Sequence, residues 1–478
     1  MKQLERRWKV FLVTAVAVFM AFLDVTIVNV AFPSIAAAFP ATSLAGLSWV
    51  LNAYNIVFAA LLVPAGRLAD LLGRRRVFFA GLALFMGASA LCGLAPAVGV
   101  LVAARVVQAA GAALLVPTSL GLLLVEFPVA RRASATALWG AVGAVAAATG
   151  PSLGGLLIEW ADWRLVFFVN LALGLLVLVP ARRLLREVRD PDRGAVPDAL
   201  GIGLLAAGVG ALSLAIVEAP SWGWGSGRVI GVVVAALVLL GAFLRRSVTH
   251  AHPVLELSLF RVRSFAVACF GVGVFALGFY ALLLANILFL VGVWGYSTLH
   301  AGFAVTPGPL MAALSSALAG RMIDRYGQRV SAVPGGLVFA LGCALFASGL
   351  GASPAYLGSF LPATLLTGLG VGLSFAGWSS AAVAELPPAR LATGSAISAC
   401  FRQLGAVLGI SVLIAALGSA PVLADFHRAY WLMAATGATA ALIALSLPRI
   451  RANVATWTSK SAPSTTPSPE RAPSAART

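Results

Sequence analysis

Fourteen apolar stretches of about 20 residues follow one another along the chain and limit what it can fold into. A helix of that length crosses a bilayer core of about 30 Å and satisfies its backbone hydrogen bonds internally, as lipid requires. The predicted spans are 10–31, 46–66, 77–97, 99–121, 134–158, 165–184, 198–218, 228–245, 264–292, 300–320, 330–351, 355–382, 394–416 and 428–448. They predict an all-α integral membrane protein and leave no room for a separate soluble domain.

The composition is that of a chain in lipid, since 60% of the 478 residues are hydrophobic and only 10% are charged. Soluble domains carry about 25% charged residues. The four cysteines lie far apart in apolar stretches and the four histidines are scattered, so neither a disulfide framework nor a metal site is expected. These features exclude a soluble enzyme, a disordered protein and a disulfide-stapled secreted domain.

Basic residues predict the orientation of the chain in the membrane. With the N-terminus inside, 28 of the 33 Lys and Arg residues fall in the N-terminal segment, the even-numbered loops and the C-terminal tail. Cytoplasmic loops carry an excess of Lys and Arg, so both termini are expected in the cytoplasm. The net charge of +17 therefore indicates orientation and not a nucleic-acid partner. The Ala- and Arg-rich, Lys-poor composition suggests a GC-rich bacterial genome, and the expected location is the bacterial cytoplasmic membrane.

An internal repeat relates the two ends of the chain. The pattern Gly-Arg-x-x-Asp-x-x-Gly-x-Arg occupies residues 66–75 and recurs 254 residues later at 320–329. The pattern Pro-x-Ala-Arg-x-Ala occupies 128–133 and recurs at 387–392. Both pairs lie on inner loops and map the first six spans onto the last six, which is typical of a transporter built from parallel repeats.

The repeat predicts how the chain is divided. The expected parts are a cytoplasmic N-terminus (1–9), a six-helix half (10–184), a cytoplasmic loop (185–197), two inserted transmembrane helices (198–246), a second six-helix half (264–448) and a disordered cytoplasmic tail (452–478). The tail is rich in Ser, Pro, Ala and Thr and cannot bury a core.

The pattern at 66–75 resembles the signature loop between spans 2 and 3 of the major facilitator superfamily. The resemblance implies the major facilitator fold, here with two six-helix halves plus two inserted helices. In that family the loop acts as a conformational latch between inward-facing and outward-facing states. The latch role is thereby assigned to Gly66, Asp70, Gly73, Arg74 and, in the second copy, Asp324.

The fifth span carries Gly150-Pro151-x-x-Gly154-Gly155, which resembles the antiporter motif of the superfamily's exporters. Proline frees a backbone carbonyl and kinks a helix, while glycine lets a neighbouring helix approach closely. The resemblance implies export over uptake. Helix packing alone is the alternative explanation for the glycines.

Residues 23–33 resemble the first-span signature of the fourteen-span drug:proton antiporters, and 163–170, 252–261 and 402–405 also resemble that family. Asp24 lies near the middle of span 1, where desolvation makes an ionised carboxylate costly, so we expect it to exchange protons. Residues 105–111 resemble the Arg-x-x-Gln-Gly-x-Gly element of the superfamily, and Arg105 is expected to act in proton coupling with Asp24. The alternatives are a structural Asp24 bonded to Thr26, Asn29 or Arg105, and an Arg105 that snorkels to a headgroup.

Polar and aromatic residues within or at the ends of spans are candidates for substrate contact. These candidates are Asn29, Gln108, Trp139, Glu218 and Trp378. Core packing is the alternative for the two tryptophans, and an interfacial carboxylate is the alternative for Glu218.

The sequence thus predicts a proton-coupled efflux transporter that exports drugs or antibiotics by alternating access, and no enzyme activity. The alternative is an exporter of one specific metabolite, such as a siderophore, an amino acid or a lipid precursor. Protons are the expected coupling ion and no cofactor or metal is expected. The expected partners are lipophilic small molecules and membrane lipids, and the expected state is a monomer.

Overall fold

The computed structural model describes residues 2–128, 131–189, 197–387 and 390–448. The predicted tail 452–478 and part of the loop 185–197 lie outside the described residues. The helices are α1 (Lys2–Ala38), α2 (Leu44–Leu72), α3 (Arg74–Gly93), α4 (Val98–Glu126), α5 (Arg132–Trp160), α6 (Leu165–Leu184), α7 (Ala199–Trp222), α8 (Gly227–Thr249), η2 (Leu257–Arg261), α9 (Arg263–Gly292), α10 (Thr298–Val305), α11 (Pro307–Tyr326), α12 (Arg329–Gly349), η3 (Tyr356–Phe360), α13 (Leu361–Val383), α14 (Leu391–Leu417) and α15 (Leu423–Leu445).

Fourteen helical spans in the described part of the chain are long and apolar enough to cross a membrane, which confirms the predicted number. Each overlaps one predicted span, and several run further; the first extends over Arg6–Ala38. The tenth span is broken into α10 and α11, because Pro307 starts a new helix at its first turn. The break was not expected from the sequence.

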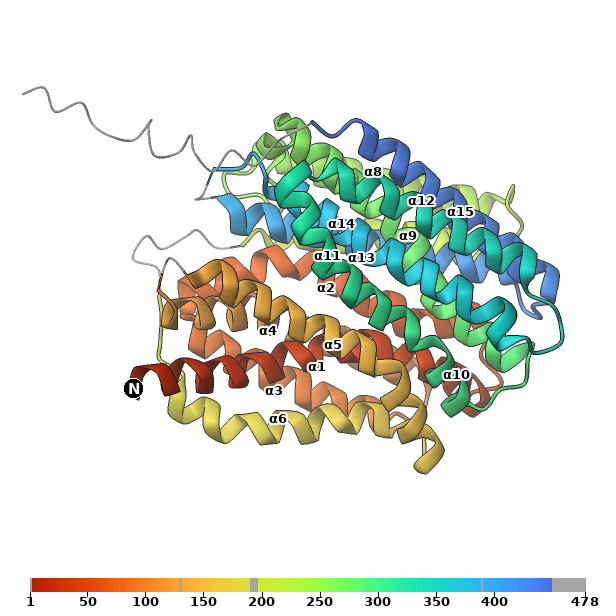
Figure 1. The fold of residues 1–478 in the computed structure, drawn as a ribbon, viewed down its shortest axis with the longest axis horizontal. Coiled ribbons are helices and arrows are strands. Elements are labelled where there is room, and N and C mark those ends of the chain that lie inside the picture. The colour runs from red at the N-terminus through yellow and green to blue at the C-terminus, as the bar shows by residue number, and fades with distance from the viewer. Residues whose placement is uncertain (1, 129–130, 190–196, 388–389, 449–478) are drawn as a thin grey trace, which may run out of the picture.

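The helices form two bundles with a third pair beside them. Helices α1–α6 pack among themselves in the lower part of Figure 1, and α9 and α11–α15 pack among themselves in the upper part, while α10 lies at the lower right beside the end of α5. The bundles meet along two seams, one between α2 and α14 and one between α5 and the α10–α11 pair. The inserted pair packs along the first seam, because α7 contacts both α2 and α14, while α8 packs on α7.

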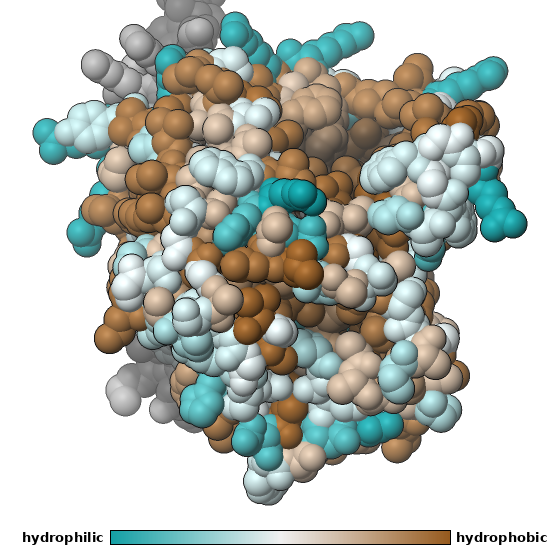
Figure 2. Space-filling view, turned by 90° about the vertical axis from the view of Figure 1, so that its right-hand side faces the viewer, coloured by the Kyte–Doolittle hydropathy of each residue, from teal (hydrophilic) through white to brown (hydrophobic). Residues whose placement is uncertain are grey.

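The two ends of the bundle are distinguished by the termini. Helix α1 begins and α15 ends on the left side of Figure 1, which we call the terminal face. The other end, where α5 ends and α10 begins, is the opposite face. Figure 2 looks onto the opposite face, where hydrophilic residues are scattered among apolar ones.

The sides of the bundle expose large apolar side chains. Leu176 of α6, Val238 of α8, Leu314 of α11 and Leu442 of α15 are each more than half exposed. A soluble protein would leave so much apolar surface in water at a large cost in free energy. In a bilayer these side chains meet acyl chains, which have the same polarity.

Candidate functional site

Asp24 lies at the centre of a buried set of hydrogen bonds in the first bundle. Its carboxylate is 0% exposed and forms an ion pair with Arg105 of α4. Gln108 of α4 donates to Asp24 Oδ1 at 2.8 Å, and Asn170 of α6 donates to the same oxygen at 3.1 Å. Donors from two further helices therefore hold the α1 carboxylate.

Arg105 is only 1% exposed, so it does not snorkel to a headgroup. Besides its pairing with Asp24, Nε donates to the Val50 carbonyl at 3.0 Å and Nη1 donates to Gln108 Oε1 at 2.7 Å. Its guanidinium also lies 4.1 Å from the centroid of the Tyr54 ring. An arginine in a membrane helix costs at least about 2.5 kcal/mol on insertion scales, and these partners offset that cost.

Of the three partners considered for a structural Asp24, Arg105 is the one that contacts it. The Thr26 hydroxyl donates to the Leu23 carbonyl at 3.1 Å, and Asn29 Nδ2 donates to the Val25 carbonyl at 2.6 Å. Both side chains thus turn back onto the backbone of α1. A substrate role for Asn29 stays a prediction.

Gln108 holds the network together and is fully buried in it. Besides its bond to Asp24, Nε2 donates to Ser89 Oγ of α3 at 2.8 Å. Its amide is therefore engaged with the protein in this conformation. Sequence reasoning gave no role to Asn170, although it lies in the 163–170 stretch that resembles the antiporter family.

The first copy of the latch motif lies at the terminal face between α2 and α3. Arg74 Nε donates to Asp70 Oδ1 at 3.0 Å, and Arg74 Nη1 donates to the Gly121 carbonyl of α4 at 3.3 Å. Gly73 has φ +104°, and a Cβ there would meet the Glu187 carboxylate. That carboxylate accepts a hydrogen bond from a backbone N–H in the first turn of α3. These contacts all lie within the first bundle.

The other two latch residues are less constrained. Gly66 lies beside α4, and a Cβ there would be 4.0 Å from the nearest atom, on Pro117. Asp324, in the second copy of the motif, is exposed. No ion pair involving Asp324 occurs among the described residues. Its latch role stays a prediction.

A carboxylate that sequence reasoning missed joins the two bundles at the terminal face. Glu256, in the segment between α8 and α9, pairs with Arg67 of α2 at 3.0 Å and with Arg390 at the start of α14 at 3.3 Å. The three side chains line a cavity of about 570 Å³. We call these residues the Glu256 clasp. Both arginines belong to the repeated loop motifs, and this was the feature of the sequence that could have pointed to the clasp.

The antiporter motif of α5 contacts a helix on each side. Gly150 and Gly154 face α1, where a Cβ would collide with its side chains. Gly155 faces α10, and a Cβ there would lie 2.9 Å from a backbone Cα of that helix. The Pro151 carbonyl likewise faces Gly302 of α10. The motif therefore brings the two bundles together near the opposite face, so close packing accounts for its glycines.

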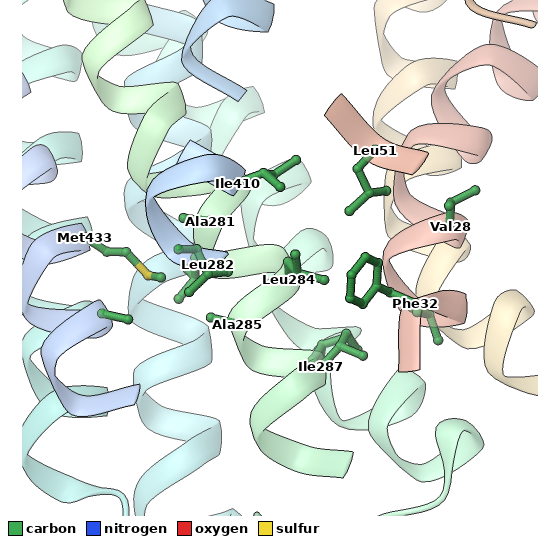
Figure 3. Packing of buried hydrophobic residues seen from close by; sticks show 14 of the residues in the cluster. Val28, Phe32, Leu51, Ala281, Leu282, Leu284, Ala285, Ile287, Ile410 and Met433 are labelled. Atoms are coloured by element: carbon green, nitrogen blue, oxygen red, sulfur yellow. The ribbon is translucent and has the colours of Figure 1, made fainter. Parts of the chain in front are cut away.

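Apolar side chains close the space between the bundles on the same side. Phe32 of α1 and Leu51 of α2 point toward Leu284 and Ile287 of α9, and Val28 of α1 belongs to the same cluster (Figure 3). All five are buried, each at 3% exposure or less. Together with the α5–α10 contact, this packing closes the opposite face.

The first seam holds a buried polar contact among three helices. Asn52 of α2 donates to Ser213 Oγ of α7 at 3.3 Å and to Ser411 Oγ of α14 at 3.1 Å. The two serine hydroxyls are 2.8 Å apart and share a hydrogen bond. The inserted pair is thus hydrogen-bonded to both bundles at once.

The remaining substrate candidates are not brought together by any contact among the described residues. Trp139 donates its indole N–H to Ser119 Oγ at 3.1 Å. Glu218 lies in the last turns of α7 and accepts a hydrogen bond from Ser221 at 2.8 Å. Trp378 is 0% exposed and fills the space beside a glycine of α9, so it occupies a core position with no free ring face in this conformation.

Comparison with known proteins gives consistent matches. The family model of the Major Facilitator Superfamily matches residues 14–409 and, in a second match, 268–475. The chain is 35% identical to "Multidrug resistance protein Stp" of Mycobacterium tuberculosis, over 84% of this chain and 74% of that protein. It is 32% identical to the "Tetracenomycin C resistance and export protein" of Streptomyces glaucescens, over 85% and 75%. It is 34% identical to "Puromycin resistance protein pur8" of Streptomyces alboniger, over 85% and 81%.

Proposed function

The chain belongs to the major facilitator superfamily, and from this we propose that it exports drugs or antibiotics across a bacterial membrane in exchange for protons. The names of the relatives, which refer to multidrug resistance and antibiotic export, support efflux. The protein is a transporter and not an enzyme. It works as a monomer, binds no cofactor, and takes lipophilic small molecules from the cytoplasm or the surrounding lipid.

The orientation follows from the basic residues. The clasp arginines Arg67 and Arg390 and the latch residue Arg74 lie at the terminal face. Cytoplasmic ends of membrane proteins carry most of the Lys and Arg residues. We therefore assign the terminal face to the cytoplasm and the opposite face to the exterior of the cytoplasmic membrane.

The proton acts at Asp24, and the buried ion pair with Arg105 is the observation that carries the proposal. A proton on the carboxylate removes the negative charge that holds Arg105, Gln108 and Asn170 around it. Arg105 then keeps the Tyr54 ring and the Val50 carbonyl as partners. Because the two protonation states bond differently to α4 and α6, each favours a different arrangement of the bundle.

Export requires the opposite face to open. In the present conformation the packing of Phe32 against α9 and of Gly155 against α10 closes that face. In alternating access the two bundles rock around a central site, so these contacts separate while the terminal face closes. Protonation of Asp24 biases one of the two states, and the substrate biases the other.

The test uses inverted membrane vesicles that hold a proton gradient reported by a pH-sensitive dye. Asp24→Asn keeps the shape and hydrogen-bonding capacity of the side chain but carries no charge and takes up no proton. We expect a panel of antibiotics and lipophilic drugs to discharge the gradient with the wild type, and Asp24→Asn to lose at least about 90% of the initial rate, as removal of an essential proton carrier predicts.

The control is Asp162→Asn, which makes the same chemical change at an exposed carboxylate paired with Arg164. It should pump like the wild type at equal protein level. Discharge by several unrelated compounds supports a broad drug exporter, whereas discharge by one compound favours a dedicated metabolite exporter. Wild-type pumping by Asp24→Asn would remove Asp24 from the mechanism.

A further inference from the structure

Arg402 is a second arginine inside a membrane span, on α14, and its surroundings differ from those of Arg105. Its Nε is buried without a hydrogen-bond partner among the described residues. The guanidinium lies 5.9 Å from the centroid of the Phe375 ring of α13. No carboxylate of the described chain pairs with it. A single cation–π contact offsets only part of the cost of placing such a cation there.

The residues around Arg402 lie where the two bundles meet. The next residue, Gln403, donates to Asn55 Oδ1 of α2 at 3.3 Å, and Tyr280 of α9 donates to Gln403 Oε1 at 3.2 Å. Arg402 therefore lies beside a polar bridge from α9 through α14 to α2, across the interface that alternating access must open and close.

Aromatic rings line the same place. Phe375 packs edge-to-face against Phe275 and Phe279 of α9, with ring centroids 5.2 Å apart in both pairs. Phe279, Phe375 and Arg402 each keep partial exposure, although their helices are packed on several sides. Apolar rings beside one unpaired cation form the combination that binds a lipophilic molecule carrying an anionic group.

The other charged residues within the spans also favour an anionic ligand at Arg402. Asp24 and Arg105 neutralise each other. The carboxylate of Glu126 lies at the end of α4 and pairs with Arg6, and Glu218 lies near the end of α7. Arg402 is thus the unpaired charge in the interior of the described spans. A bound cation would be repelled there, whereas a bound anion would offset the desolvation of the guanidinium.

We propose that Arg402 binds the carboxylate of a lipophilic acidic substrate, whose apolar body packs against the Phe279 and Phe375 rings. This rests on the proposed efflux function and names its substrate class as organic acids. Guanidinium presents a planar fork of donors that matches a carboxylate, so the contact orients the substrate as well as attracting it.

The test compares three fluorescent probes that share one aromatic body and differ in charge: dansylglycine, dansylamide and dansylcholine. Their affinities are measured for the purified protein in lipid nanodiscs, with empty nanodiscs subtracted. We expect dansylglycine to bind at least about tenfold more tightly than the other two, because only its carboxylate accepts a charge-assisted hydrogen bond from the guanidinium. Arg402→Ala should remove that preference and leave dansylamide binding unchanged.

Two further variants keep the result interpretable. Arg402→Lys retains the charge without the fork and should retain part of the preference. Arg428→Ala removes an exposed arginine from the start of α15 and should retain all of it. The affinities of the three probes for the wild type test the proposal by themselves. The proposal can therefore be contradicted even if Arg402→Ala does not fold. Dansylglycine that binds the wild type no better than dansylamide, or not at all, overturns it.

The proton-gradient assay separates this proposal from the function on which it rests. A wild type that exports drugs but shows no preference for dansylglycine overturns the Arg402 assignment and leaves efflux standing. A wild type that prefers dansylglycine through Arg402 but discharges no gradient with any compound supports the anion site and overturns proton-coupled efflux.

Discussion

A charged side chain inside a membrane span is costly in lipid and needs a partner. The structure places Asp24 and Arg105 in direct contact, and the same cost is the reason that both could be identified from the sequence. Asn170 carries no charge, so its cost in lipid did not single it out, and the resemblance of residues 163–170 to the antiporter family did not indicate that it holds Asp24. Glu256 lies 189 residues from Arg67, and only the packing of the bundles brings the two together.

At the same scale, the geometry of Arg105 predicts that its charge alone is insufficient. Arg105→Lys keeps the charge, but a single ammonium cannot reach Asp24, Gln108 and the Val50 carbonyl together as the guanidinium does. We expect at least about a tenfold loss of drug-driven proton movement in inverted vesicles, equivalent to about 1.4 kcal/mol.

Arg164→Lys is the matched control for this change, because Arg164 lies at the opposite face and is partly exposed. Equal transport by Arg105→Lys and the wild type would show that the ion pair needs only a positive charge.

Whole helices were predicted well from sequence, since hydropathy reports directly on the length of chain that lipid covers. All fourteen spans exist. Their ends were less accurate. Helix α1 begins among polar residues that hydropathy does not detect, and α4 continues through Leu122–Val125 to Glu126, beyond the predicted end at residue 121. The break between α10 and α11 was missed because the apolar run continues across Pro307.

Helix α5 gives a prediction at the scale of an element. Gly155→Ala places a methyl group 2.9 Å from the α10 backbone, where it cannot fit without moving that helix. We expect the closed arrangement of the opposite face to be destabilised by about 1–3 kcal/mol, the usual cost of overpacking. Spin labels on α5 and α10 near that face should report a longer mean distance by pulsed electron resonance.

Gly140→Ala is the control on the same helix, because a Cβ there meets no atom within 4 Å. An unchanged distance distribution in Gly155→Ala would show that the glycine does not set the approach of the two helices.

The whole molecule is held together differently along its two seams. The α2–α14 seam is covered by α7 and carries the Asn52–Ser213–Ser411 contact, whereas the α5–α10 contact depends on the close approach of backbones. The internal repeat predicted two related bundles, but not where the inserted pair would pack. That position depends on which residues of other helices hydrogen-bond to the polar side chains of α7, such as Ser213. These residues are far apart in the sequence, so the repeat pattern does not predict the contact.

The Glu256 clasp gives the prediction at this scale. Glu256→Gln removes the charge shared by Arg67 and Arg390 and should loosen the terminal face by about 1 kcal/mol, since all three side chains are partly exposed to solvent. A single cysteine introduced at Ser258 should then react several times faster with a membrane-impermeant thiol reagent in inverted vesicles.

The four native cysteines are buried, so they give little background labelling. Glu159→Gln, near the end of α5 at the opposite face, serves as the matched control. An unchanged labelling rate in Glu256→Gln would show that the clasp does not restrain the terminal face.

The hydrogen-bond and ion-pair partners of Asp24, which lies on α1, come from α4 and α6, while Arg402 on α14 has its aromatic neighbours on α9 and α13. If Asp24 carries the proton and Arg402 binds the substrate, as proposed, the residues for energy coupling and for substrate recognition lie in separate halves of the chain. Substitutions that alter which molecule is carried can accumulate in the second half without disturbing the first. Related transporters could then evolve to export different compounds while keeping the same proton-coupling residues.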